Sequence, residues 1–329
     1  MKKTMLAITL MLVFGLSFVQ AQQIHIAGND DNDAVYWING WRIVLPKASN
    51  YAGANAIAVS GSNVYIAGVD GYDAVYWLNG SRTVLPKTSD RAYAGAIALS
   101  GSDVYITGAD GYSDASDAVY WLNGSRTVLP KSGRSAFAGA IAVSGTNVYI
   151  AGQDGDDAVY WLNGRRMVLP KLGGPRPWAV ATAIAISGSD IYITGACGEG
   201  EYDELGNTYS NAVYWLNGRL NIINNEGGLP YPGASSIVIS GSDIYIGGGD
   251  GYNAGYWLNG RYIELTSDGQ QSNVNAIAIS GSNVYKVGFR RDGNNWHTVY
   301  WLNGRMVILP RTGTGSFGDA SANGIVVTP

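Results

Sequence analysis

The chain has 329 residues, including 46 glycines, 22 tyrosines and 10 tryptophans, and only 14% of its residues are charged. Disordered chains are rich in charge and poor in aromatic residues, so this composition excludes a disordered protein. The formal net charge is −4. Without a basic excess to displace counterions from phosphates, the chain is not expected to bind nucleic acid.

The first 21 residues have the layout of an export signal. Two lysines at positions 2 and 3 precede an apolar run over 5–19, and Val19-Gln20-Ala21 ends in the small-x-small pattern of a signal-peptidase site. The apolar run is shorter than the ~20 residues that span a bilayer. We therefore expect a signal peptide at 1–21, export to the periplasm, cell surface or exterior, and a mature chain of 22–329 without a membrane span.

One pentapeptide, Tyr-Trp-Leu-Asn-Gly or its Ile variant, occurs seven times along the chain. Its tryptophans are Trp37, Trp77, Trp121, Trp161, Trp215, Trp257 and Trp301. The 308 residues of the mature chain divided among seven repeats give an average of 44 residues each. The repeats therefore use up the mature chain as a single domain at 22–329.

Each repeat is expected to contain four short strands. In the second repeat we place them at 56–60, 64–68, 74–78 and 82–86. Asn79-Gly80 joins the third strand to the fourth, and Asn-Gly between two β-rich runs is the strongest short signal for a type I′ hairpin. Four antiparallel strands at a period of 40–45 residues are typical of a propeller blade.

The two ends of the mature chain are expected to complete each other. The segment at 24–28 matches the second strand of a repeat, and the segment at 322–328 matches the first strand that the N-terminal repeat lacks. A C-terminal strand that completes the N-terminal blade closes a ring and removes open sheet edges. The sequence therefore predicts an all-β, seven-bladed β-propeller with four-stranded antiparallel blades, expected to be a monomer.

The repeat also resembles known propellers. Ala96-Ile97-Ala98-Leu99-Ser100 followed by Asp103-Val104-Tyr105-Ile106-Thr107-Gly108 resembles the first hairpin of NHL-type and related six- or seven-bladed bacterial propellers. The Tyr-Trp-x-Asn-Gly signature is similar to repeats of secreted bacterial propeller proteins in the wider NHL/kelch-like group. The Gly-His and Trp-Asp pairs of WD40 blades and the regular Gly-Gly pairs of kelch blades are missing. The resemblance implies the fold, whereas propellers host enzymes, lectins, receptors and scaffolds alike.

The connections between strands indicate which face of the ring binds. The turns from first to second strand and from third to fourth strand share one face and hardly vary between repeats. The connections from second to third strand and from one repeat to the next share the other face and vary in length and chemistry. Because the fold does not fix the length or chemistry of these connections, they are free to carry binding residues. We therefore predict that this variable face is the binding face.

The variable face is rich in acidic residues. An aspartate followed by glycine recurs at Asp70, Asp110, Asp154 and Asp250. A ring of carboxylates would collect cations or basic partners, but recurrence in most repeats favours the alternative that these residues form turns and bind nearby backbone. Structural calcium is a weaker alternative for the acids at 30–33, 110–117 and 154–157, which do not form a twelve-residue calcium loop. No other cofactor or metal is predicted.

Two connections break the sevenfold pattern, at 196–211 and 289–297. Together with aromatic residues of other connections they supply the predicted binding residues, which are Trp178, Trp296, Tyr72, Tyr112, Tyr202, Tyr252, Glu201, Asp203, Arg290 and Arg291. Aromatic rings of this kind form protein hot spots, and beside carboxylates and amides they also suit sugars. Because the irregular connections favour one asymmetric contact, the first hypothesis is a non-catalytic binding or scaffold protein with a protein partner. The alternative is a carbohydrate-binding, lectin-like propeller.

Residues for catalysis are scarce. The only histidines are His25 and His297, and the sequence offers no Ser-His-Asp or Cys-His arrangement, zinc spacing or phosphate loop. A polysaccharide-acting enzyme that uses acids from 199–204 is the third hypothesis, and no catalytic residue is predicted. Cys197 is the single cysteine, so no internal disulfide forms, and we expect it to be a small residue in a loop.

Overall fold

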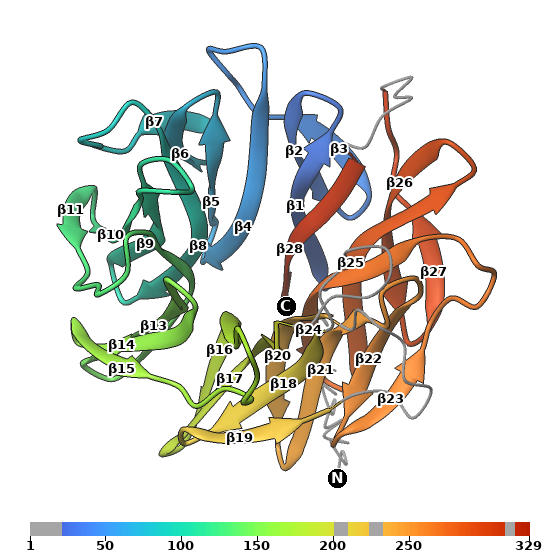
Figure 1. The fold of residues 1–329 in the computed structure, drawn as a ribbon. Helices are drawn as coiled ribbons and strands as arrows, with labels where there is room; N and C mark the ends of the chain where they lie inside the picture. The colour runs from blue at the N-terminus through green and yellow to red at the C-terminus, as the bar shows by residue number, and fades with distance from the viewer. Residues whose placement is uncertain (1–21, 201–209, 224–232, 313–319) are drawn as a thin grey trace, which may run out of the picture.

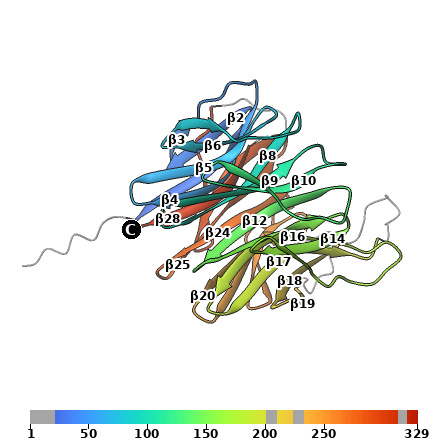
Figure 2. The same cartoon turned by 90° about the vertical axis from the view of Figure 1, so that its left-hand side faces the viewer.

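The computed structural model describes residues 22–200, 210–223, 233–312 and 320–329. It consists of seven four-stranded antiparallel sheets arranged in a ring (Figure 1). In the side view of Figure 2, strands of successive sheets run across the ring from one face towards the other. This architecture confirms the predicted seven-bladed propeller. The expected export signal at 1–21 lies outside the described residues, and within them no helix could cross a membrane.

We number the blades 1 to 7 along the chain, each written from the innermost strand outwards. Blade 1 consists of β28 (Ala320–Thr328), β1 (Gln23–Asp30), β2 (Asp33–Ile38) and β3 (Trp41–Val44). Blade 2 consists of β4 (Ala52–Ser60), β5 (Asn63–Asp70), β6 (Asp73–Leu78) and β7 (Ser81–Val84). Blade 3 consists of β8 (Ala92–Ser100), β9 (Asp103–Asp110), β10 (Asp117–Leu122) and β11 (Ser125–Val128). Blade 4 consists of β12 (Ala136–Ser144), β13 (Asn147–Asp154), β14 (Asp157–Leu162) and β15 (Arg165–Val168).

The other three blades follow the same order. Blade 5 consists of β16 (Trp178–Ser187), β17 (Asp190–Gly198), β18 (Asn211–Leu216) and β19 (Arg219–Ile222). Blade 6 consists of β20 (Gly233–Ser240), β21 (Asp243–Gly249), β22 (Ala254–Leu258) and β23 (Arg261–Glu264). Blade 7 consists of β24 (Ser272–Ser280), β25 (Asn283–Asp292), β26 (Asn295–Leu302) and β27 (Arg305–Ile308).

Blade 1 closes the ring as the sequence predicts. The C-terminal strand β28 pairs antiparallel with the N-terminal strand β1, from Ile24 opposite Val327 to Asp30 opposite Ala320, and Figure 1 shows the two strands side by side. Because β28 pairs with β1, blade 1 has four strands like the other blades, and the inner edge of β1 is not left open.

The Asn-Gly turns have the geometry that the hairpin prediction requires. Asn79 has φ of 49° and Gly80 has φ of 83°, as a type I′ turn demands of its two central residues. The side-chain oxygen of Asn79 also accepts a hydrogen bond from the backbone N–H of Val64 at 2.8 Å. The asparagines with this positive φ are Asn39, Asn79, Asn123, Asn163, Asn217, Asn259 and Asn303.

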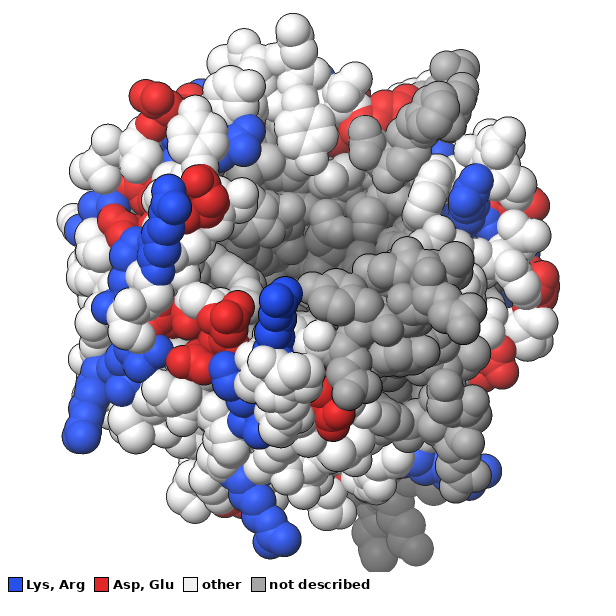
Figure 3. All heavy atoms as spheres, viewed as in Figure 1, with Lys and Arg blue, Asp and Glu red and all other residues white. Residues whose placement is uncertain are grey.

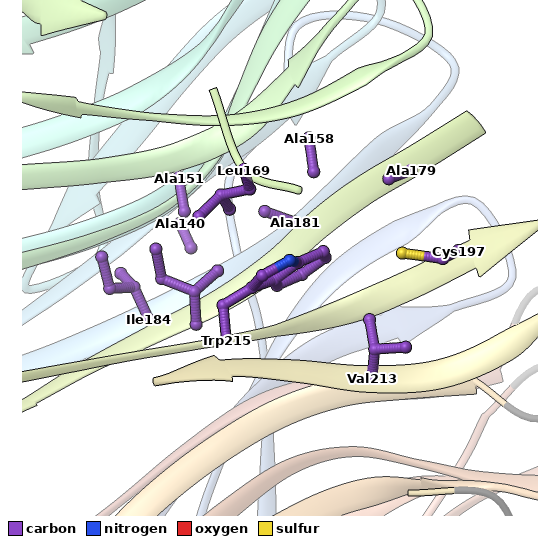
Figure 4. Close-up of a cluster of buried hydrophobic side chains, with 11 residues drawn as sticks. Ala140, Ala151, Ala158, Leu169, Ala179, Ala181, Ile184, Cys197, Val213 and Trp215 are labelled. Atoms are coloured by element: carbon purple, nitrogen blue, oxygen red, sulfur yellow. The ribbon is translucent and has the colours of Figure 1, made fainter. Parts of the chain in front are cut away.

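The seven repeat tryptophans are all fully buried between blades. The indole N–H of Trp77 donates to the backbone carbonyl of Pro46, in the connection from blade 1, at 2.8 Å. Figure 4 shows the equivalent Trp215 in a cluster with Leu169 of the connection from blade 4 and Ala181 of β16. These rings are therefore core and not surface binding sites.

Three local expectations are wrong. The inner strand of blade 2 begins at Ala52, earlier than the predicted position 56, and β5 runs on to Asp70. The segment at 289–297, expected as a loop, is mostly the end of the β25–β26 hairpin, because its backbone keeps the strand pairing as far as Asp292 opposite Asn295. Cys197, expected in a loop, lies on β17 and is fully buried.

Candidate functional site

In blades 1 to 4 the aspartates at the end of the second strands are inter-blade ties, whereas Asp250 of blade 6 accepts hydrogen bonds within its own turn, from the N–H groups of Tyr252 and Asn253. The carboxylate of Asp70 accepts hydrogen bonds from the backbone N–H groups of Ala48 at 2.7 Å and Ser49 at 2.9 Å, in the connection from blade 1. Arg82 of the outer strand β7 pairs with the same carboxylate at 2.6 Å. The corresponding pairs in blades 1, 3 and 4 are Asp30 with Arg42, Asp110 with Arg126 and Asp154 with Arg166.

These ties keep the buried carboxylates ionised. Burial alone would raise the pKa of Asp70, but the hydrogen bonds from Ser49 and Ala48 and the charge of Arg82 outweigh it, so the pKa is lowered. The pKa values of Asp30, Asp110 and Asp154 are lowered against the same burial penalty by their own hydrogen bonds and arginines. This ring of acids serves the fold, as the turn interpretation of the sequence favours.

A second ring of acids is paired with lysines. Asp33 lies 2.8 Å from the ammonium of Lys47, and the same pair recurs within blades 2, 3 and 4 at 2.7 to 2.8 Å as Asp73 with Lys87, Asp117 with Lys131 and Asp157 with Lys171. The negative charge of these acids on the variable face is thus balanced locally. In the part of the chain that the structure describes, no three His, Cys, Asp or Glu residues come together as a metal site.

Blades 5 and 7 replace both members of the Asp–Arg pair together. At the position of Asp70, blade 5 has Cys197, and at the position of Arg82 it has Leu220. Burial is the main reason that the pKa of the Cys197 thiol is raised to about 11, which makes it an unreactive core residue at neutral pH. Blade 7 reverses the charge: Arg290 takes the place of the aspartate and pairs with Asp268 of the preceding connection.

A cavity of about 780 Å³ opens at the centre of the variable face, over blades 2, 3 and 4. Figure 3 looks onto this face and shows its centre hollowed, with charges of both signs around the described rim. The rings of Tyr51, Tyr93 and Phe137 line the cavity together with the amides Asn55 and Gln153. The polar lining also includes the hydroxyl groups of Ser113, Ser116 and Ser135.

Blades 3 and 4 depart from the repeat where their inner strands pass this cavity. In blade 2 the side chain of Asn55, at a β-bulge, donates to the backbone carbonyl of Ala94 in blade 3 at 2.8 Å. The same inter-blade bond is made by Thr182, Asn275 and Asn323. Blades 3 and 4 have glycine there instead. A Cβ atom at Gly95 would lie 2.9 Å from the ring of Tyr93, and one at Gly139 would lie 3.1 Å from the ring of Phe137.

This exchange brings aromatic surface to the cavity. Glycine has no side chain to donate the inter-blade hydrogen bond, which is worth about 1 kcal/mol. In place of that bond, the rings of Tyr93 and Phe137 lie against the backbone of Gly95 and Gly139. Local departures from a fold's own rules are expected at functional sites. Only two of the seven blades have glycine in place of the hydrogen-bonding residue, so the cavity is asymmetric.

Two of the predicted residues, Tyr72 and Tyr112, lie beside Arg91, a residue of the cavity wall. Tyr72 and Tyr112 are 64% and 51% exposed. The guanidinium carbon of Arg91 lies 4.8 Å from the ring centroid of Tyr72 and 5.5 Å from that of Tyr112, so the arginine side chain contacts both rings. Arg91 itself lines the cavity.

The structure places the other predicted residues away from the cavity lining. Tyr252 is exposed on blade 6. Trp178 begins β16 and is half-buried, and Trp296 is half-buried against Phe289, with ring centroids 5.0 Å apart. Arg291 lies 5.9 Å from the ring of Trp296. Glu201, Tyr202 and Asp203 lie outside the described residues.

His25 is not part of the cavity. It is buried in β1, where its ring nitrogens contact the hydroxyl groups of Tyr36 at 2.6 Å and Thr328 at 3.2 Å. Burial lowers the pKa of His25, so the imidazole is neutral at pH 7. A neutral histidine held between two hydroxyl groups stabilises blade 1 at the ring closure.

The comparisons with known proteins show the fold alone. No protein-family model and no curated protein matches the chain. A Bacteroides uniformis protein described as a candidate 6-phosphogluconolactonase aligns with a TM-score of 0.53 and 12% identity over 94% of this chain and all of that one. A chain of the nidogen/laminin complex aligns with a TM-score of 0.47 and 12% identity, covering 93% and 98%. YjhT aligns with a TM-score of 0.46 and 10% identity, covering 80% and 99%.

Proposed function

We propose that this chain is a non-catalytic, exported binding protein that takes a carbohydrate chain in the cavity of its variable face. The observation that carries the proposal is the pair of rings, Tyr93 and Phe137, that replaces a structural hydrogen bond at the cavity wall. Flat aromatic rings beside amide and hydroxyl groups suit sugars, which offer apolar ring faces and many hydroxyls. A volume of about 780 Å³ lies within the usual range of ligand pockets.

The lining of the cavity supports binding in preference to catalysis. The described wall contains aromatic, amide, hydroxyl and small apolar residues, and its only charged residue is Arg91. Glycoside hydrolysis requires two carboxyl groups a few ångströms apart, and the aspartates nearest this cavity, such as Asp70, are already paired with arginine. The polysaccharide-acting alternative depends on the acids at 199–204, most of which lie outside the described residues.

A glycan array tests the proposal. The mature chain 22–329 is compared with Phe137→Ala, which removes one ring of the cavity, and with Tyr252→Ala, which removes an exposed ring of blade 6. We expect the wild type and Tyr252→Ala to retain the same glycans and Phe137→Ala to lose them, with all three proteins unfolding at similar temperatures. Retention of no glycan, or equal retention by all three, would refute carbohydrate binding in this cavity.

A protein partner is the second candidate, and the β25–β26 hairpin favours it. This hairpin continues past the end of the other blades' second strands, and its tip carries Arg291 and Trp296 in contact with each other. A mixed cationic and aromatic patch is typical of protein hot spots. The chain serves as bait in an envelope extract beside Trp296→Ala, and a protein retained only by the wild type would support this candidate.

A further inference from the structure

Arg91 is a cation without an anionic partner. The structure gives it contacts with the rings of Tyr72 and Tyr112, and no ion pair joins it to any described carboxylate. In contrast, Arg82 and Arg126 of the same blades are paired with buried aspartates. The Arg91 side chain is exposed and lines both the cavity of about 780 Å³ and an adjoining one of about 710 Å³ at the rim.

The backbone fixes the position of Arg91 between two blades. The N–H of Ala92 donates to the carbonyl of Tyr72 at 2.9 Å, and the carbonyl of Arg91 accepts from the N–H of Gly111 at 2.8 Å. The side chain is in turn held between the rings of Tyr72 and Tyr112. An arginine placed in this way loses less conformational entropy when it binds a ligand than a freely moving surface arginine does.

The fold does not require arginine at this place. The same backbone bond is made by Tyr51, whose carbonyl accepts from Gly71, and by Ser135, whose carbonyl accepts from Gly155, both at 2.8 Å. Tyrosine, arginine and serine thus occupy equivalent positions in successive connections. The charge of Arg91 is therefore a property of the cavity and not of the repeat.

We propose that the cavity selects acidic oligosaccharides, with the guanidinium of Arg91 pairing with a sugar carboxylate. This inference rests on the proposed carbohydrate-binding function. Arginine presents N–H groups in a planar fork that matches a carboxylate, while the rings of Tyr93 and Phe137 offer flat surfaces to the sugar units. The chain has a net charge of −4, so general attraction does not bring an anion here, and selection depends on the local pairing.

The test uses two ligands with the same sugar chain, one with free carboxylates and one with neutral methyl esters. Tetragalacturonate and its fully methyl-esterified form are titrated by calorimetry into the mature chain, into Arg91→Gln and into the control Arg134→Gln. Arg134 is an exposed arginine of the same face outside the cavity lining. We expect the acid form to bind the wild type and Arg134→Gln alike and to bind Arg91→Gln about 10- to 100-fold more weakly, the usual effect of a lost charged hydrogen bond.

The outcomes separate this inference from the proposed function. If both forms of the tetrasaccharide bind the wild type equally, or if Arg91→Gln binds the acid form as tightly as the wild type, selection of acidic sugars is refuted while carbohydrate binding stands. If a tetraglutamate peptide binds as tightly as tetragalacturonate, the site recognises charge alone and the inference is again refuted. If the cavity binds neither form and the glycan array is also blank, the proposed function itself is refuted.

Discussion

Replacing Lys286 with methionine should stabilise this protein. Lys286 pairs with Trp301 in the middle of blade 7 and is only 1% exposed. The equivalent residue opposite the repeat tryptophan is isoleucine in every other blade, at Ile26, Ile66, Ile106, Ile150, Ile193 and Ile246. The ammonium lies 4.1 Å from the ring centroid of Tyr256, and among the described residues no carboxylate forms an ion pair with it.

The magnitude follows from the protonation equilibrium of the amine. Burial lowers the pKa of Lys286 to about 8, against about 10.4 for an unperturbed lysine. At pH 7 this difference destabilises the folded state by about 3 kcal/mol. The contact with the Tyr256 ring returns about 1 kcal/mol. Methionine has a similar length and no charge, so we expect Lys286→Met to raise the free energy of unfolding by about 2 kcal/mol at pH 7.

The gain should depend on pH in a defined direction. The folded-state pKa lies below the unfolded one, so between pH 8 and about pH 10 the unfolded state binds more protons and the wild type becomes more stable as pH rises. Lys286→Met lacks this gain, and its advantage should fall below about 1 kcal/mol at pH 10. Urea unfolding at both pH values measures this, with Lys47→Met, which removes a lysine already paired with Asp33, as the control. An advantage that is missing at pH 7, or that persists unchanged at pH 10, would show that the buried ammonium of Lys286 does not destabilise the fold.

Three further predictions concern the inter-blade ties and the turns. Asp70→Asn should lower the free energy of unfolding by about 2–4 kcal/mol at pH 7 in urea titrations. Because the pKa of Asp70 is lowered in the folded state, the loss should shrink as pH falls below about 4, and a loss independent of pH would contradict this. Cys197→Asp should destabilise the chain, and adding Leu220→Arg should recover part of the loss, so simple additivity in this double-mutant cycle would contradict the pairing. Asn79→Ala should lower the melting temperature, since alanine is disfavoured at positive φ, while an unchanged melting temperature would argue against the type I′ turn.

The repeat made most of the fold predictable from sequence. Each Tyr-Trp-Leu-Asn-Gly motif predicts a strand and the turn that follows it. The same pattern matched the two incomplete ends of the chain to the strands β1 and β28. A strand and its hairpin turn are determined by residues that are adjacent in the chain, so they can be predicted from the sequence.

The cavity was harder to predict because its wall comes from three blades. The rings of Tyr93 and Phe137 had a signal in the sequence, since glycine, asparagine or serine stands at the matching place of four other inner strands. The position of Arg91 between Tyr72 and Tyr112 had none, because it depends on backbone hydrogen bonds between separate repeats. The predicted importance of Tyr72 and Tyr112 stays a prediction, now with Arg91 as their neighbour.

A crystal structure of the mature chain with tetragalacturonate would show whether one asymmetric cavity over blades 2, 3 and 4 binds a sugar chain. We expect a single tetrasaccharide against the rings of Tyr93 and Phe137, with one carboxylate paired with Arg91 and the matching places of blades 5, 6, 7 and 1 empty. A tetrasaccharide bound elsewhere on the ring, or repeated at every blade, would rule out a single sugar site in this cavity.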